Sequence, residues 1–323
     1  MRRAGEATRQ PTRAALVLGI LGALAGCASG QHTCQVGADC ISGICNSDGR
    51  CAEPRDAARV DGGLGAGDGG EGVDASASDV DAWREDGGAR VCSSNGDAVI
   101  ERSEVPLRAG LHATFRVASD ATFATAGTMV VGRRTWDLGG ALSGDADQRV
   151  DLLDPAGAWW SGTFPTATYA ATLSTASTNQ GVFQVTDTEL LLLGVVSPED
   201  GFTRTQLEYD PPVRVLVFPL HEGDTWTTSS SVSGQLNGVV GVYTEEYVST
   251  VDASGDLVTP LGTMAVLRVR TDLTRTSGLA TLATQRTYGF VAECFGTAAT
   301  ITSQLFETSA DFSDCSEIRR IAP

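Results

Sequence analysis

Lysine is absent from the 323-residue sequence, and all 23 basic residues are arginine. Without a lysine amine, Schiff-base catalysis and a lysine-containing phosphate-binding loop are excluded. Histidine is scarce as well, since His32, His112 and His221 are the three copies, and none belongs to a His-x-Glu or His-Glu-x-x-His motif. Because recognisable catalytic residues are so few, the sequence favours a protein that is not an enzyme.

Basic charge is also in deficit. The chain carries 40 acidic residues against its 23 arginines, which gives a formal net charge of −17 at pH 7. Nucleic acids and anionic lipid surfaces both require a basic footprint on the proteins that bind them. The composition therefore argues against nucleic acid as a partner.

The longest apolar run, Ala14 to Ala25, follows four arginines and is too short to span a bilayer. It leads into Leu24-Ala25-Gly26-Cys27. This pattern resembles the signals of bacterial lipoproteins, in which a cysteine after small residues is acylated before cleavage. The resemblance implies a signal peptide over residues 1–26 and a lipidated Cys27 that anchors the protein to a membrane of the bacterial cell envelope. Ala28 and Ser29 lack the aspartate that retains some lipoproteins at the inner membrane, so we expect the outer membrane, on its periplasmic or surface-exposed side.

A compact cysteine cluster follows the anchor, with Cys34, Cys40, Cys45 and Cys51 separated by five, four and five residues. In an exported chain this density predicts two disulfides within a small unit over residues 27–51, with three connectivities open. The spacing resembles short Cys-rich repeats of extracellular proteins, including the dickkopf N-terminal pattern. A zinc site is the alternative, although only Cys40 and Cys45 have the close spacing of a zinc pair.

Residues 52–91 are dominated by Gly, Ala, Ser and Asp and show no apolar period, so they predict a disordered, acidic linker.

The segment that follows the linker, residues 92–106, has two interpretations. With Ser93 as the first position, Asn95, Asp97 and Glu104 occupy three ligand positions of an EF-hand-like calcium loop. Ser93 in place of Asp, and Ala98 in place of the turn glycine, depart from that pattern. The alternative is a plain Asn-Gly turn without a cofactor.

Residues 92–323 are predicted to be all-β, because alternating runs bounded by turn residues recur from His112 to Glu307. Short connections favour a mainly antiparallel curved sheet or a β-sandwich. The run Leu190 to Val196 has no polar position and predicts a central strand covered on both faces. Ala158 to Thr163 is predicted as a strand, Pro165 to Leu173 as the one short helix, and the ranges 251–255 and 259–262 as hairpin turns.

Within this domain, Met264-Ala-Val-Leu-Arg-Val-Arg-Thr-Asp-Leu273 alternates so that Leu267 and Val269 face one side, while Arg268 and Arg270 face a side expected to be wet. The segment from Val213 to Thr300 resembles the β-rich domains of bacterial exported lipoproteins. The motifs that carry this resemblance are Pro-Leu-x-x-Gly-x-x-Trp, a Thr-Pro-x-Gly hairpin and a late Tyr-x-Phe strand. Such domains are described as lipoprotein-carrier-like curved sheets, and the resemblance transfers no catalytic residue.

The remaining side chains of interest are few. Of Cys92, Cys294 and Cys315, one pair and one free thiol are expected, and a Cys92–Cys294 disulfide is favoured because it fixes the start of the domain. His221 is interpreted as a solvated turn residue. Adjacent strand residues point to opposite faces, which separates Glu245 from Glu246 and Trp159 from Trp160. One tryptophan is expected in the core, and the other is available to a ligand.

Three functions remain open from the sequence. The first is a lipid-anchored, non-enzymatic envelope protein that displays its β-domain for binding or structural purposes, with an envelope or extracellular protein or a glycan as partner. The second is a carrier of an apolar ligand within a curved sheet, which requires an apolar concave face. The third is a hydrolase whose carboxylates are brought together only by the fold.

Overall fold

A computed structural model describes Cys92 and residues 94–323. The predicted signal peptide, the lipidation site Cys27, the four-cysteine unit and the linker lie outside the described residues. Within the described residues the fold is all-β, as predicted, and consists of one large, curved antiparallel sheet. The helical segment found there is the single turn η3 (Arg102–Glu104), and no described helix has the length and apolarity to cross a membrane.

The sheet has 14 strands. Their bounds are β1 (His112–Thr122), β2 (Thr128–Val130), β3 (Arg133–Asp137), β4 (Ala146–Asp151), β5 (Tyr169–Ser174), β6 (Ser177–Val185), β7 (Glu189–Val196), β8 (Gln206–Val217), β9 (Thr225–Leu236), β10 (Val239–Val258), β11 (Thr263–Ser277), β12 (Ala280–Ala292), β13 (Gly296–Ser303) and β14 (Asp314–Ala322).

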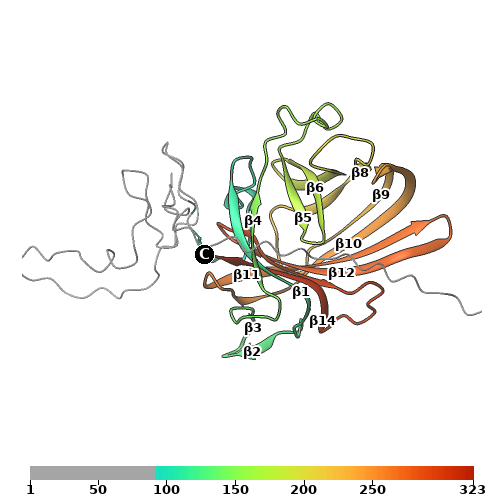
Figure 1. Ribbon diagram of the computed structural model, residues 1–323. Coiled ribbons are helices and arrows are strands. Elements are labelled where there is room, and N and C mark those ends of the chain that lie inside the picture. Colours follow the sequence, from blue (N-terminus) through green and yellow to red (C-terminus); the bar gives the residue numbers. More distant parts are fainter. Residues whose placement is uncertain (1–91, 93) are drawn as a thin grey trace, which may run out of the picture. The chain divides into compact units, whose positions relative to one another are not determined.

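Twelve of the strands follow the order β4-β1-β14-β13-β12-β11-β10-β9-β8-β7-β6-β5, while β2 pairs with β3 and β3 pairs in parallel with β10. In Figure 1 the sheet curves so far that β5 and β6 stand over the orange and red strands β12 and β14. Its two ends meet directly after β4, where the N–H of Leu153 donates to the carbonyl oxygen of Ala170 over 2.7 Å and the N–H of Ala170 donates to the carbonyl oxygen of Leu153 over 3.0 Å. The single bridge makes the sheet nearly closed.

Both faces of the sheet carry an apolar core. The concave core joins opposite walls, since it contains Tyr169 of β5 and Val291 of β12, and the segment from Ile100 to Val105 packs into it. On the convex face, the β2–β3 hairpin covers β10 to β14, and its Trp136 is fully buried against Phe290. The alternating strand residues thus find apolar partners on both sides because loops and hairpins cover the outside.

A second convex cover lies over β5 to β7. There the loop before β5 places Trp160 and Phe164 against Val182 and Leu193. Leu190 faces the concave core while Leu193 faces this outer cluster, so β7 is covered on both faces as predicted. The turn at residues 259–262 also forms as predicted, because Thr259 and Gly262 exchange backbone hydrogen bonds between β10 and β11.

Several local predictions were wrong. Residues 158–163 form consecutive turns, and β5 replaces the helix expected at 165–173. Residues 251–255 continue β10 instead of turning, because a β-bulge between Val251 and Ala253 absorbs the irregularity. The face of Arg268 is not wet, since its side chain pairs with Asp252 beneath Trp136.

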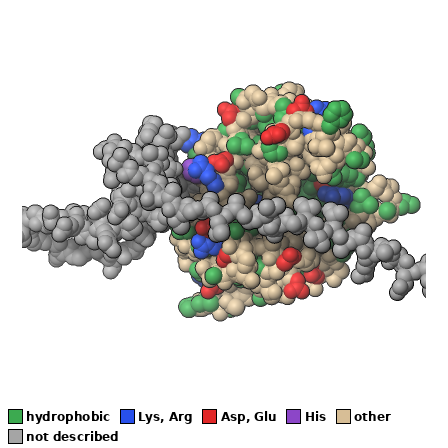
Figure 2. All heavy atoms as spheres, viewed as in Figure 1, with side chains coloured by type: hydrophobic (Ala, Val, Ile, Leu, Met, Phe, Trp, Pro, Cys, Tyr) green, Lys and Arg blue, Asp and Glu red, His purple; other side chains and the backbone are tan. Residues whose placement is uncertain are grey.

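Large apolar side chains that remain exposed gather at hairpin tips. Met129 and Val130 end β2, Val131 follows them in the turn to β3, and Leu279 lies between β11 and β12. In the space-filling view the green side chains lie mainly toward the edges of the molecule, and acidic and basic side chains are interspersed on the visible face (Figure 2).

Candidate ligand-binding cavity

A cavity of about 260 Å³ lies on the concave side of the sheet, near the seam where its ends meet. Strands β1, β4, β13 and β14 form one wall, and β5 to β8 form the other. The lining is predominantly apolar, and its largest side chains are Leu107, Phe115, Leu152, Tyr169, Phe183 and Ile321. The cavity is partly open to solvent, and a concave, mostly apolar space with a few polar groups is the usual form of a small-molecule site.

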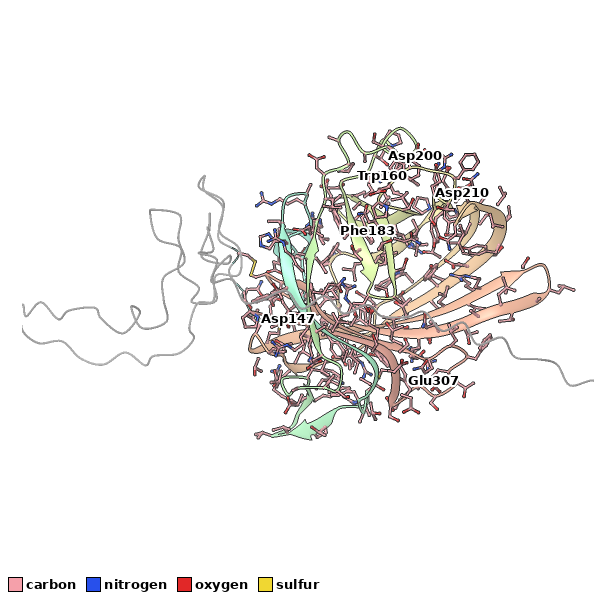
Figure 3. The ribbon with its side chains drawn as sticks, viewed as in Figure 1. Asp147, Trp160, Phe183, Asp200, Asp210 and Glu307 are labelled. Atoms are coloured by element: carbon pink, nitrogen blue, oxygen red, sulfur yellow. A yellow bond between two sulfur atoms is a disulfide. The ribbon has the colours of Figure 1, made fainter. Side chains whose placement is uncertain are left out.

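The strand period directs these side chains inward. In β5, Tyr169 and Ala171 face the cavity, whereas Ala170 between them is buried on the outer side. Phe183 of β6 stacks on Tyr169 with ring centroids 5.1 Å apart, and its neighbour Val182 faces outward toward Trp160 (Figure 3). The β5–β6 hairpin therefore forms a cavity wall with its inward side chains and part of the outer core with its outward side chains.

Polar groups in the lining come mainly from the β13–β14 side. Arg319 of β14 projects into the cavity together with Thr300, which is its register partner on β13, and His112 of β1 also lines the space. The Arg319 side chain is 12% exposed, and its guanidinium lies 5.5 Å from the Phe115 ring. Burial lowers the pKa of Arg319, but an arginine keeps its charge at neutral pH.

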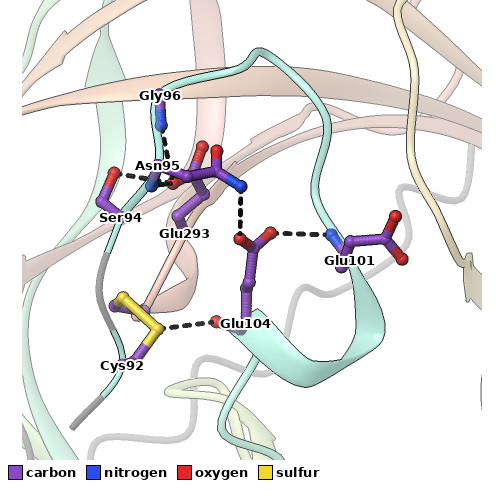
Figure 4. The surroundings of a disulfide bond; sticks show 8 residues. Cys92, Ser94, Asn95, Gly96, Glu101, Glu104 and Glu293 are labelled. Atoms are coloured by element: carbon purple, nitrogen blue, oxygen red, sulfur yellow. Dashed lines mark hydrogen bonds between the residues drawn. A yellow bond between two sulfur atoms is a disulfide. The ribbon is translucent and has the colours of Figure 1, made fainter.

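The segment before β1 lies across the concave face and is fixed at two points. Ile100 exchanges backbone hydrogen bonds with Leu220, and a disulfide joins Cys92 to Cys294. The predicted Cys92–Cys294 pair is confirmed. Next to the disulfide, the Glu293 carboxylate accepts hydrogen bonds from the hydroxyl of Ser94 and the N–H of Asn95, at 2.6 and 2.7 Å (Figure 4). Pro106 and Leu107, which end this segment, contribute to the cavity lining.

The three calcium candidates lie in that same segment. The Asn95 amide donates to Oε1 of Glu104 over 3.1 Å, and Oε2 of Glu104 accepts from the Glu101 N–H (Figure 4). The Asp97 carboxylate instead accepts from the N–H of Val99. Across the described residues, no group of three or more His, Cys, Asp or Glu side chains is placed to hold a metal ion. The structure therefore brings Asn95 and Glu104 together, while the Asp97 carboxylate bonds the backbone of its own turn. Calcium binding by this segment stays a prediction.

The third cysteine of the domain is buried. Cys315 of β14 is fully enclosed, and burial raises the pKa of its thiol to about 11. A protonated, inaccessible thiol is a poor nucleophile. The anchor candidate Cys27 and the cluster Cys34, Cys40, Cys45 and Cys51 precede the described residues.

The other singled-out residues lie apart from the cavity. His221 is exposed in its turn, with Nδ1 3.3 Å from the Asp224 carboxylate. Glu245 is buried and Glu246 is exposed, as the strand period predicted. Trp160 joins the outer core, and the half-buried Trp159 bonds the carbonyl of Ser197 and stacks with Arg204. The indole of Trp159, which the sequence left available to a ligand, thus contacts groups of the protein itself.

Sequence reasoning missed Arg319 and the whole strand that carries it. The segment Glu317-Ile-Arg-Arg-Ile-Ala322 does alternate, because Arg319 and Ile321 share a face while Ile318 and Arg320 share the other. That alternation was the available signal.

A second hollow, of about 380 Å³, lies between the β2–β3 hairpin and residues 96–100, and its lining includes Arg133, Arg134 and Glu293.

Comparisons with protein-family models, with curated proteins and with solved structures find no match.

Proposed function

We propose that this chain is a lipid-anchored, non-enzymatic protein of a bacterial cell envelope whose β-domain binds an apolar ligand inside its curved sheet. The observation that carries the proposal is the cavity of about 260 Å³ on the concave face, because its lining comes from both halves of the sheet and is mostly apolar. Concave, mostly apolar spaces of this kind are where proteins bind small molecules. The lipobox-like residues before Cys27 support the anchor.

Ligand binding is tested by native mass spectrometry of the full-length protein, purified gently from the cells that make it. The expected result is a bound apolar molecule whose mass disappears on denaturation. As a second measurement, titration with decanol should saturate one site in a full chain that carries Cys27→Ser, which the anchor proposal predicts to be water-soluble. A bare protein that also leaves decanol unbound would contradict the proposal.

A pair of variants locates the site. Ala113 lines the cavity, and the next residue of β1, Thr114, faces the other side of the sheet. Ala113→Phe should fill the space and weaken decanol binding by about tenfold or more, which corresponds to about 1.4 kcal/mol. Thr114→Phe should leave binding unchanged. Equal effects of the two substitutions would place the ligand elsewhere.

The anchor has its own test. Cys27→Ser should move the protein from the membrane fraction of cells to the soluble fraction, because the acylated thiol is removed. Continued membrane retention would count against lipidation at Cys27. Separation of inner and outer membranes then tests the expected outer-membrane location.

A second function is favoured by the exposed apolar side chains Met129, Val130 and Val131 at the tip of the β2–β3 hairpin. Clustered exposed apolar residues often mark contact with a macromolecule. The anchored domain would then be displayed to an envelope or extracellular protein or a glycan. Cross-linking from the hairpin tip in intact cells tests this function, and the absence of any cross-linked partner would argue against it.

A further inference from the structure

Arg319 is the feature of the cavity that packing does not explain. Its side chain crosses from β14 to the opposite wall, where Nη1 donates to the carbonyl oxygen of Leu173 over 2.8 Å. Its Nε is buried and has no hydrogen-bond partner among the described residues. A buried charged group with an unused donor costs free energy, because that donor has given up its hydration. Since Arg319 lines the cavity, it can recover this free energy by donating to an acceptor on a bound ligand.

Glu317 is the nearest acidic group. Its Oε1 lies 3.9 Å from Nε of Arg319, beyond hydrogen-bond distance. Its Oε2 is occupied by the β5–β6 turn, since it accepts from the hydroxyls of Ser174 and Thr175 and from the Thr175 N–H. Glu317 therefore holds the hairpin in place and compensates the Arg319 charge only partly. His112 and Tyr169 are the other titratable side chains in the lining.

We propose that the cavity takes a single-chain amphiphile with a carboxylate head group, such as a medium-chain fatty acid, and that Arg319 binds the head group. This inference rests on the proposed function and adds the chemistry of the ligand. A planar guanidinium presents donors in a fork that matches a carboxylate, which an alcohol or alkane does not use. The alkyl chain lies along the apolar surface that Phe183, Tyr169 and Leu107 provide. The volume of about 260 Å³ suits one chain of moderate length.

Isothermal titration of the full chain carrying Cys27→Ser, with decanoate and decanol as matched probes, tests this inference without any change at Arg319. Decanoate should bind about tenfold or more tightly than decanol, since a hydrogen bond to a charged group contributes more than one to a neutral hydroxyl. Equal binding of both probes would overturn the carboxylate inference and leave the apolar-ligand function standing. Binding of neither probe would overturn both.

Variants then assign the preference to one residue. Arg319→Gln should abolish the preference for decanoate while decanol still binds, and Arg319→Lys should restore part of it, because lysine keeps the charge and loses the fork. Arg116→Gln is the matched control, since Arg116 faces the other side of β1 and pairs with the exposed Asp147. An unchanged preference in folded Arg319→Gln protein would show that Arg319 does not bind the head group. Circular dichroism checks the fold of each variant.

Discussion

Glu245 is a buried charged residue whose hydrogen-bond partners are arranged around it. Glu245 of β10 is fully buried, and it accepts hydrogen bonds from Arg275 Nε over 2.7 Å and from the Tyr247 hydroxyl over 2.5 Å. Burial is the main cause that raises the pKa of Tyr247, and the nearby Glu245 carboxylate adds to it. The phenol therefore stays protonated and keeps donating to Glu245 at neutral pH.

Replacing Arg275 should show how much the stability of the domain depends on the cation beside Glu245. Arg275→Leu leaves the Glu245 carboxylate buried without its cation, so we expect the free energy of unfolding to fall by about 3 kcal/mol. Urea denaturation followed by circular dichroism measures the change. Adding Glu245→Gln to Arg275→Leu should recover part of the loss, because the uncompensated charge is then gone.

The control for that measurement is Arg133→Leu. Arg133 pairs with Asp256 at a largely exposed position, where an ion pair contributes less than about 1 kcal/mol. A loss for Arg275→Leu no larger than the loss for Arg133→Leu would contradict the assigned role of the buried cluster.

At the scale of strands, the sequence predicted several strands correctly, but it predicted poorly where strands begin and end. β1 and β7 follow the expected runs because both depend on local patterns, an alternation in β1 and a continuous apolar run in β7. β5 was predicted as a helix, since Pro165 suits a helix start; pairing with β6 and burial of Tyr169 override that local preference. Gly255 looked like the end of a turn, but it lies within β10. A glycine within a strand can also mark a place where another backbone segment approaches closely, and Gly255 is such a place.

Gly255 gives a sharp test of how β3 docks on β10. A Cβ at Gly255 would overlap the carbonyl oxygen of Arg134, next to the parallel register of Thr135 with Asp256. Gly255→Ala should therefore destabilise the domain by about 1–3 kcal/mol and loosen the cover over the convex core. Urea unfolding gives the free energy, and the fluorescence of buried Trp136 reports the loosened hairpin.

Gly241 of the same strand provides the matched control, because a Cβ there would meet nothing within 4 Å. Gly241→Ala should be neutral or slightly stabilising. If the two alanine variants unfold at the same urea concentration, the close approach of β3 to β10 is not a constraint on the fold.

Across the whole molecule, the cavity depends on contacts that no local pattern encodes. The sequence alone predicted an antiparallel curved sheet, yet it also left a sandwich open, because the pairing of β1 with β14 and the meeting of Leu153 with Ala170 join distant segments. The cavity exists only where these ends converge. Arg319 could therefore be placed on a strand face by its alternation, but not in the lining of a cavity.

The closing bridge can be removed with little loss of core packing, since Leu153 is 40% exposed. Leu153→Pro deletes the N–H that donates to Ala170, so the seam should open locally. We expect faster amide hydrogen exchange at Ala170 and weaker decanol binding, whereas Leu153→Ala should keep the protection of Ala170. Unchanged exchange in Leu153→Pro would show that the bridge does not hold the seam.

The disulfide between Cys92 and Cys294 also decides how the domain would carry mechanical load. A pull on the chain before Cys92 is transmitted through the two sulfur atoms to the turn between β12 and β13. From there the covalent path to the C-terminus runs through β13 and β14, and the segment containing β1 to β12 is bypassed. Tension applied to the chain before Cys92 would therefore leave the cavity wall of β5 to β8 outside the covalent force path.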